Sequence, residues 1–139
     1  MNIDELLDEF DFLDDWEERC EFLIDLGMEL PKLPDDEKVE ANRVHGCQSS
    51  VWMIIDVGSN GQTTVDIRAD SDAMIVRGLI AVLLTIFSGR TPQEILDTDI
   101  KSIFSRLSLE RHLSTTRRNG LYSMVKRIRR IAQQTCEPN

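Results

Sequence analysis

A long apolar segment limits how this chain can fold. Across residues 73–87 nearly every side chain is apolar, and Arg77 and Thr85 are the exceptions. A helix that is apolar around its whole circumference is buried, so the other elements are expected to surround this one. We expect an acidic or hydroxyl side chain among residues 70–72 to cap it. Gly78 would let another element approach it closely.

Helical spacing predicts two helices before this segment. Asn2 with Glu5 has the form of a capping box at the start of the first helix. A second pattern begins near Trp16 and carries Cys20 on its apolar side, which favours a core role for this thiol. Gly27 is the expected end of that helix, because glycine commonly follows the last helical turn.

Helices are also predicted after the apolar segment. Thr91 followed by Pro92 has the form of a helix start, and another helix is expected to begin near Asp99. Residues 114–119 form an expected polar loop, which contains Arg117. The last helix is expected to face inward with Leu121, Met124, Val125, Ile128, Ile131 and Ala132.

The middle of the chain has the pattern of an antiparallel hairpin. Residues 51–57 and 62–69 are rich in strand-forming residues, and residues 58–61 end in Asn-Gly, which supplies a positive φ. A third strand is expected around residues 42–44. We therefore predict an α+β fold in which a small antiparallel sheet of about three strands packs against several helices. We expect one domain over residues 1–139.

Charge is divided unevenly along the chain. Residues 1–72 contain 20 acidic and 5 basic residues, whereas residues 73–139 contain 5 acidic and 11 basic ones, so net charges of −15 and +6 combine to −9. A net charge of −9 argues against a general nucleic-acid binder. The asymmetry suits an electrostatically steered protein partner, or else the two halves neutralise each other in the fold. The basic outer face of the last helix is either solvated or an interaction site; it has Lys126, Arg127, Arg129 and Arg130.

Targeting features and cysteine usage point to the cytoplasm. The N-terminus is acidic and lacks the basic start of a signal peptide, and the longest apolar run is far shorter than the ~20 residues of a membrane span. Three cysteines without paired spacing indicate a reducing compartment. We therefore expect a cytoplasmic protein that binds neither membrane nor nucleic acid.

Cys47 is the main candidate for chemistry. It follows Gly46 where a polar loop turns into the first strand, and no second cysteine is near enough in sequence for a zinc site or a local disulfide. Such a thiol is either a nucleophile or covalent carrier, or a small buried hydrophobe. His45 either lowers the pKa of this thiol or is an ordinary loop residue, and His112 is the remaining histidine. Cys136, near the C-terminus, is expected to be incidental.

Four segments resemble the SufE family of sulfur acceptor proteins, which includes the similar SufE and CsdE branches. Segment 42–52 resembles its active-cysteine segment and reads NRVHGCQSSVW. Three further segments match in the same order: residues 70–82, DSDAMIVRGLIAV; residues 89–95, GRTPQEI; and residues 112–121, HLSTTRRNGL. The chain departs from the family at His45, where another residue is common, and at residues 115–116, where the family often has Pro-Ser.

The resemblance implies a partner protein for a pyridoxal-phosphate cysteine desulfurase of the SufS or CsdA type. Cys47 would accept the desulfurase's persulfide sulfur, stimulate that enzyme, and deliver sulfur to a SufB-type scaffold for iron–sulfur cluster assembly, or to another acceptor. Such a protein needs no cofactor or metal, is not itself an enzyme, and is a monomer or weak homodimer. The family fold is related to IscU-type scaffolds.

The resemblance also implies roles for residues around Cys47. Gly46, Gln48 and His45 would support the loop, which in the family switches between sheltered and extended states. Asp72 and Arg117 would control the loop or contact the desulfurase, or else only cap a helix and hold a loop.

Three other functions remain open from the residues alone. An IscU-like iron–sulfur scaffold would need about three thiolates at one site, so Cys20 and Cys136 would have to converge on Cys47. A Cys-dependent hydrolase or transferase would need His45 or His112 as a base. A plain acidic interaction module would leave Cys47 without a role.

Overall fold

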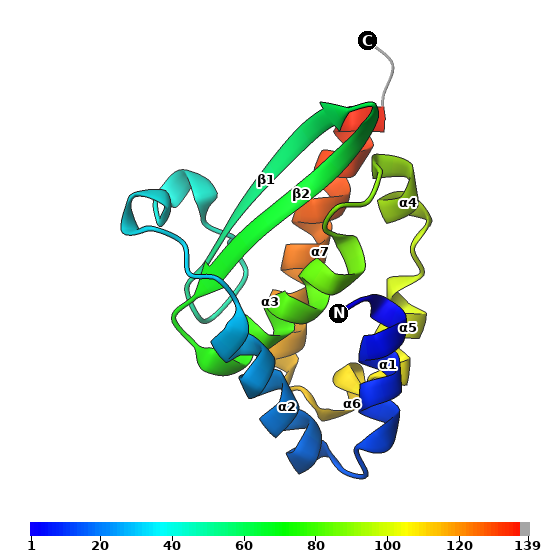
Figure 1. Cartoon of the computed structure of the whole chain (residues 1–139). Coiled ribbons are helices and arrows are strands. Elements are labelled where there is room, and N and C mark those ends of the chain that lie inside the picture. The colour runs from blue at the N-terminus through cyan, green and yellow to red at the C-terminus, as the bar shows by residue number, and fades with distance from the viewer. Residues whose placement is uncertain (137–139) are drawn as a thin grey trace.

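The structure, a computed structural model, describes residues 1–136 and has the predicted α+β architecture (Figure 1). A hairpin of two antiparallel strands packs on α3 through β2, while α2 packs along α3. The strands are β1 Val51–Asn60 and β2 Gln62–Ser71, and two 3₁₀ turns precede them, Asp35–Glu37 and Glu40–Asn42. The helices are α1 Ile3–Phe12, α2 Trp16–Glu29, α3 Met74–Phe87, α4 Pro92–Asp97, α5 Ile100–Arg106, α6 Leu109–His112 and α7 Thr115–Cys136.

The hairpin has the alternation that its sequence predicts. Met53 lies opposite Ala69 and Val57 opposite Val65, so the odd-numbered residues of both strands share one face. Most of these face the core, whereas Asp66 and Arg68 on β2 are exposed. The strands run further than predicted, because Asn60 pairs with Gln62 and only Gly61, at φ +86°, separates them.

The third strand is reduced to a single bridge. Arg43 pairs with Trp52, but the residues before it form a 3₁₀ turn instead of continuing along β1. The sheet among residues 1–136 therefore has two strands rather than about three. The chain leaves the sheet here because residues 40–42 turn, which lets the following loop cross toward α7.

Two glycines bring α2 and α3 into close contact. A Cβ at Gly27 would lie 2.7 Å from the carbonyl oxygen of Met74, and a Cβ at Gly78 would lie 2.7 Å from the carbonyl carbon of Leu23. Gly78 thus has the predicted packing role. The prediction that Gly27 ends α2 is wrong, since the helix continues to Glu29 and uses this glycine for packing.

Arg77, the charged exception in the apolar helix, is buried in an ion pair with Asp70. Its guanidinium also donates to the carbonyls of Gly27 and Leu30, which lie at the C-terminal end of α2, where backbone carbonyls are no longer fully paired within the helix. Asp70 additionally accepts from the backbone N–H of Leu33 at 3.0 Å. These contacts tie α2, α3, β2 and the connector into one buried network and account for the charge in an apolar segment.

Helix α7 begins earlier than the sequence suggests. Ser114 caps it, because its hydroxyl accepts from the N–H of Arg117 at 3.2 Å and its carbonyl from the N–H of Arg118 at 2.9 Å. The prediction of a polar loop over residues 114–119 is therefore wrong, and Arg117 lies in the first helical turns. The helix also extends to Cys136, the last of the described residues.

None of the helices within residues 1–136 combines the length with the apolar character that crossing a membrane requires.

Candidate functional site

The loop that carries Cys47 is fastened at its N-terminal base. We call residues 45–49 the Cys47 loop. Just before it, the N–H of Val44 donates to the carbonyl of Val51 at 2.9 Å. From α7, Arg127 donates to the carbonyls of Arg43 at 2.8 Å and Ala41 at 3.3 Å. One arginine therefore joins the loop base to the long C-terminal helix.

Asp72 fastens the other base of the loop. Its carboxylate accepts from the N–H of Ser50 at 3.1 Å, and its own N–H donates to the carbonyl of Ser50 at 3.3 Å. The hydroxyl of Ser71 donates to the same carbonyl at 2.8 Å. The prediction that a side chain among residues 70–72 caps α3 is wrong, because Ala73 occupies the N-cap position and no side chain caps the helix there. Asp72 instead holds Ser50.

Between these bases, the loop touches α7 through Cys47. The thiol donates to the carbonyl of Gly120 at 3.5 Å. Among the described residues, the side chains of residues 45–49 make one other polar contact, between His45 and Glu40. Gly46 has φ +92°, and a Cβ there would lie 2.5 Å from the hydroxyl of Ser123. Only glycine therefore allows the loop this turn against α7.

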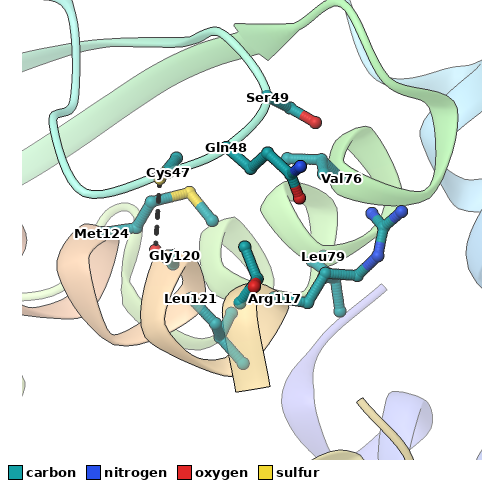
Figure 2. Close-up of a pocket in the computed structure, with 10 residues that line it drawn as sticks. Cys47, Gln48, Ser49, Val76, Leu79, Arg117, Gly120, Leu121 and Met124 are labelled. Carbon is teal, nitrogen blue, oxygen red and sulfur yellow. Dashed lines mark hydrogen bonds between the residues drawn. The ribbon is translucent and has the colours of Figure 1, made fainter. Parts of the chain in front are cut away.

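A small cavity of about 40 Å³ lies beside the thiol. Figure 2 shows the sulfur of Cys47 pointing toward Gly120 and Met124 of α7, with Val76 and Leu79 of α3 further along the cavity. Its lining residues are Cys47, Gln48, Ser49, Val76, Leu79, Thr116, Arg117, Gly120, Leu121 and Met124. The site therefore places a reactive atom at the edge of a mainly apolar enclosure.

The surroundings of Cys47 favour the neutral thiol. Burial raises the pKa of the Cys47 thiol, and the positive charge of Arg43 opposes this only in part. The hydrogen bond to the Gly120 carbonyl also needs the S–H proton. In this loop position Cys47 is therefore sheltered and a weak nucleophile, because the thiolate is the reactive form.

The two histidines do not contact Cys47. His45 is exposed, and its ring Nε2 lies 2.8 Å from a carboxylate oxygen of Glu40. His112 stacks on Trp16 with ring centroids 4.8 Å apart. The geometry gives neither histidine the position of a base for Cys47.

The other predicted residues have distinct positions. Gln48 is exposed on the loop and Gly46 forms its turn. Arg117 lines the cavity from α7, and its Nη1 atom is buried without a hydrogen-bond partner among the described residues. The structure thus brings Cys47, Gln48 and Arg117 to one cavity and places Asp72 at the loop base.

The other thiols lie elsewhere. Cys20 is half-buried rather than fully in the core. Burial raises the pKa of its thiol, while a hydrogen bond from Trp16 and the positive charge of Arg117 lower that pKa in part. Cys136 follows Gly120 by roughly four and a half turns of the continuous helix α7, or about 24 Å of rise. It therefore cannot join Cys47 at one metal. Within residues 1–136 no group of three or more His, Cys, Asp or Glu side chains is arranged to hold a metal ion.

Sequence reasoning missed Gly120, Met124, Arg43 and Arg127. Gly120 and Met124 are four residues apart, so helical spacing already places them on one face of the last helix. Nothing in the sequence indicates that this face meets the Cys47 loop. The effect of Arg43 on the thiol and the bonds of Arg127 to the loop base depend on tertiary packing.

Comparison with known proteins shows the family of this chain. The SufE family, described as an Fe-S metabolism associated domain, matches residues 4–132. An uncharacterized SufE-like protein of Rhizobium etli is 43% identical over 133 residues, which cover 95% of this chain and 90% of that protein. A second such protein, from Rhizobium meliloti, is 41% identical and covers 95% of both.

A solved structure has the same fold. The solution structure of a hypothetical protein from Thermus thermophilus superposes with a TM-score of 0.73 at 22% identity, over 95% of this chain and 93% of that one. At that identity the likeness concerns the fold alone. On the family match and the two relatives, the chain belongs to the SufE family, which is associated with iron–sulfur metabolism.

Proposed function

We propose that this protein is a sulfur acceptor and carrier that uses Cys47. It takes persulfide sulfur from a pyridoxal-phosphate cysteine desulfurase of the SufS or CsdA type, stimulates that enzyme by clearing its persulfide, and delivers sulfur to a SufB-type scaffold. The observation that carries the proposal is a lone thiol on a loop that is fastened at both bases and held over a small cavity by one weak hydrogen bond.

The transfer is a thiol–disulfide type exchange without net oxidation. The Cys47 thiolate attacks the outer sulfur of the desulfurase persulfide, and a new S–S bond forms at Cys47. The S–S bond on the desulfurase cysteine breaks, and that cysteine leaves as a thiolate. The proton on the outer sulfur moves with it, so Cys47 becomes a persulfide and the donor cysteine is free for another cycle.

Attack requires the loop to leave its sheltered position. In that position the raised pKa of Cys47 keeps it protonated, and α7 covers one side of the sulfur. Extension into the partner's site breaks the bond to the Gly120 carbonyl and removes the burial that raises the pKa. The loop then pivots between its bases at Val44 and Ser50, and thiolate forms where the donor sulfur is available.

Return of the loaded loop would protect the carried sulfur. A cavity of about 40 Å³ beside the thiol is large enough for a water-sized group, and one sulfur atom is of similar size. Met124 and Leu121 provide an apolar lining that keeps water and soluble reductants away. The enclosure therefore suits a sulfur atom that must survive between two proteins.

Neighbouring residues support this cycle. Gly46 permits the turn, and Gln48 and His45 flank the moving thiol on the exposed loop. Asp72 restrains the loop base until the partner binds. We propose that Arg117 makes a charge-assisted contact with the desulfurase, for which its buried, unpartnered Nη1 atom is available after the loop extends. Unchanged desulfurase affinity in Arg117→Ala would refute that role.

The test is the steady-state rate of the desulfurase with cysteine and a limiting reductant. We expect wild-type protein to raise the rate and Cys47→Ser to leave it at the basal value. Cys136→Ser and Cys20→Ser serve as matched controls and should stimulate like wild type. His45→Ala should retain stimulation, because His45 does not contact the thiol. Equal stimulation by Cys47→Ser would contradict the proposal, and complete loss in His45→Ala would favour a hydrolase-type site.

A further inference from the structure

A basic groove of about 490 Å³ runs along α7 beside the Cys47 loop. One wall is the outer face of α7, and the other is the chain that leads into the loop. The residues of this basic groove are Arg43, Val44, His45, Ser123, Lys126, Arg127 and Arg130. Because Val44 and His45 directly precede Gly46 and Cys47, anything bound in the groove lies next to the moving thiol.

Positive charge on the arginines and the lysine of the groove is not neutralised by this chain. Within residues 1–136 no carboxylate lies within ion-pair distance of Arg43, Lys126, Arg127 or Arg130. Elsewhere basic side chains do find acids: Arg68 pairs with Glu37, and Arg106 with Asp11. The acidic N-terminal half therefore leaves these four side chains uncompensated, although the protein as a whole carries −9. The carboxylate paired with a groove residue is that of Glu40, which lies 2.8 Å from His45.

The charges are also crowded. Lys126 and Arg130 are exposed and one helical turn apart, with Arg127 half-buried between them. Burial and the like charge of Arg130 lower the pKa of Arg127. Repulsion between these like charges is relieved when a group of opposite charge binds among them, which favours such binding.

We propose that the basic groove docks an acidic segment of the desulfurase and so places the donor persulfide beside the Cys47 loop. This inference rests on the proposed function. Arginine side chains bind carboxylates with charge-assisted, often bidentate bonds, and three neighbouring basic residues on one side of α7 suit several carboxylates in a row. The acidic remainder of the surface repels the same segment, which fixes the orientation of docking. It also disfavours nucleic acid as the occupant.

Docking would also loosen the loop. Arg127 donates to the carbonyls of Ala41 and Arg43 at the loop base. A carboxylate that enters the groove competes for the same guanidinium, and a bond between two charged groups is stronger than a bond to a neutral carbonyl. Binding of the partner therefore weakens the N-terminal fastening of the loop when the thiol has to extend.

The test compares two double variants with the same change of net charge. Lys126→Glu with Arg130→Glu reverses the exposed charges of the groove. Lys101→Glu with Arg111→Glu reverses an exposed lysine and an exposed arginine on α5 and α6. We expect the groove variant to raise the Kd for the desulfurase at least fivefold at low salt, mainly through slower association, and the control variant to change it less than twofold. The neutral pair Lys126→Gln with Arg130→Gln should give an intermediate Kd.

Sulfur uptake separates this inference from the proposed function. At saturating desulfurase, the groove variant should load Cys47 with sulfur to the same extent as wild type. If wild type loads and the groove and control variants bind equally well, docking in the groove is refuted while the carrier role stands. If wild type takes up no sulfur on Cys47, the proposed function itself fails.

Discussion

Replacing Gly120 by alanine should stabilise the protein and at the same time expose Cys47. Gly120 lies inside α7, where alanine is favoured over glycine by about 1 kcal/mol. The new Cβ would lie 3.6 Å from the Cβ of Cys47, which is an ordinary contact, but 3.3 Å from its sulfur, which is tight enough that the sulfur has to move away by a few tenths of an ångström. The Cys47 loop is the part that can yield, because its thiol makes a single 3.5 Å bond to α7.

The expected size of the effect follows from that bond. A neutral hydrogen bond contributes about 0.5–1 kcal/mol, so its loss raises the population of the displaced loop roughly two- to fivefold. Displacement also lessens the burial that raises the Cys47 pKa, which increases the thiolate fraction further. We therefore expect Cys47 in Gly120→Ala to react with iodoacetamide at least two to five times faster at neutral pH, while the free energy of unfolding increases by up to about 1 kcal/mol.

The assay is time-resolved alkylation read by peptide mass spectrometry, combined with urea unfolding. The exposed Cys136 provides an internal rate standard in each sample. Asn119→Ala is the matched control, because it improves helix propensity on the exposed side of α7 without contacting Cys47. An unchanged Cys47 rate with lowered stability would refute the reasoning, since it would mean that the loop is rigid and α7 has to shift instead.

Three further predictions concern the framework and the thiol. Gly78→Ala should lower the free energy of unfolding by roughly 2 kcal/mol or more in a urea titration, because its Cβ collides with the backbone of Leu23; an unchanged midpoint would contradict the close helix packing. Asp72→Asn should leave the melting temperature nearly unchanged and speed Cys47 alkylation about twofold, by weakening the bond from the Ser50 N–H; slower alkylation would contradict a fastening role. Burial raises the folded-state pKa of Cys47, so the stability that the neutral thiol contributes is complete below its unfolded pKa of about 8.5 and is lost as pH rises through the folded pKa. In this pH range the free energy of unfolding should fall more steeply for wild type than for Cys47→Ala. Parallel curves would count against the buried thiol.

The elements that follow local rules could be predicted from the sequence. Asn2 accepts from the N–H of Glu5 as its helix cap, and a helix starts at Thr91 as predicted, with Thr91 and Glu94 forming a capping box. The hairpin alternates as its residues indicate, and Gly61 supplies the positive φ. Each of these depends on residues close together in the chain, so one-dimensional patterns suffice.

The failures involve residues whose partners are distant in the chain. A glycine near a helix end looks the same whether it stops the helix, as expected for Gly27, or lets another helix approach, as it does. An acidic residue before a helix looks like a cap, but Asp72 bonds to Ser50 instead. The loop predicted over residues 114–119 is an exception, because the cap that starts α7 there is local: Ser114 accepts from the N–H of Arg117, and its polar neighbours hide this cap in the sequence.

The candidate site could likewise be predicted from the sequence only in part. Cys47 stands out from its sequence context and from the resemblance of its segment to the family, and its role stays a prediction. The cavity and the contact with Gly120 follow from tertiary packing, which brings α7 under a loop more than seventy residues earlier in the chain. The fastening by Arg127 has the same origin.

The central claim is that Cys47 carries sulfur, and intact-protein mass spectrometry after incubation with a cysteine desulfurase and cysteine tests it most directly. We expect wild type to gain the mass of one sulfur atom, which peptide mapping places on Cys47. Cys47→Ser should gain none, while Cys20→Ser and Cys136→Ser should gain it normally. Sulfur found on Cys20 or Cys136 instead, or no gain with a desulfurase that is active on cysteine and binds the protein, would contradict the account.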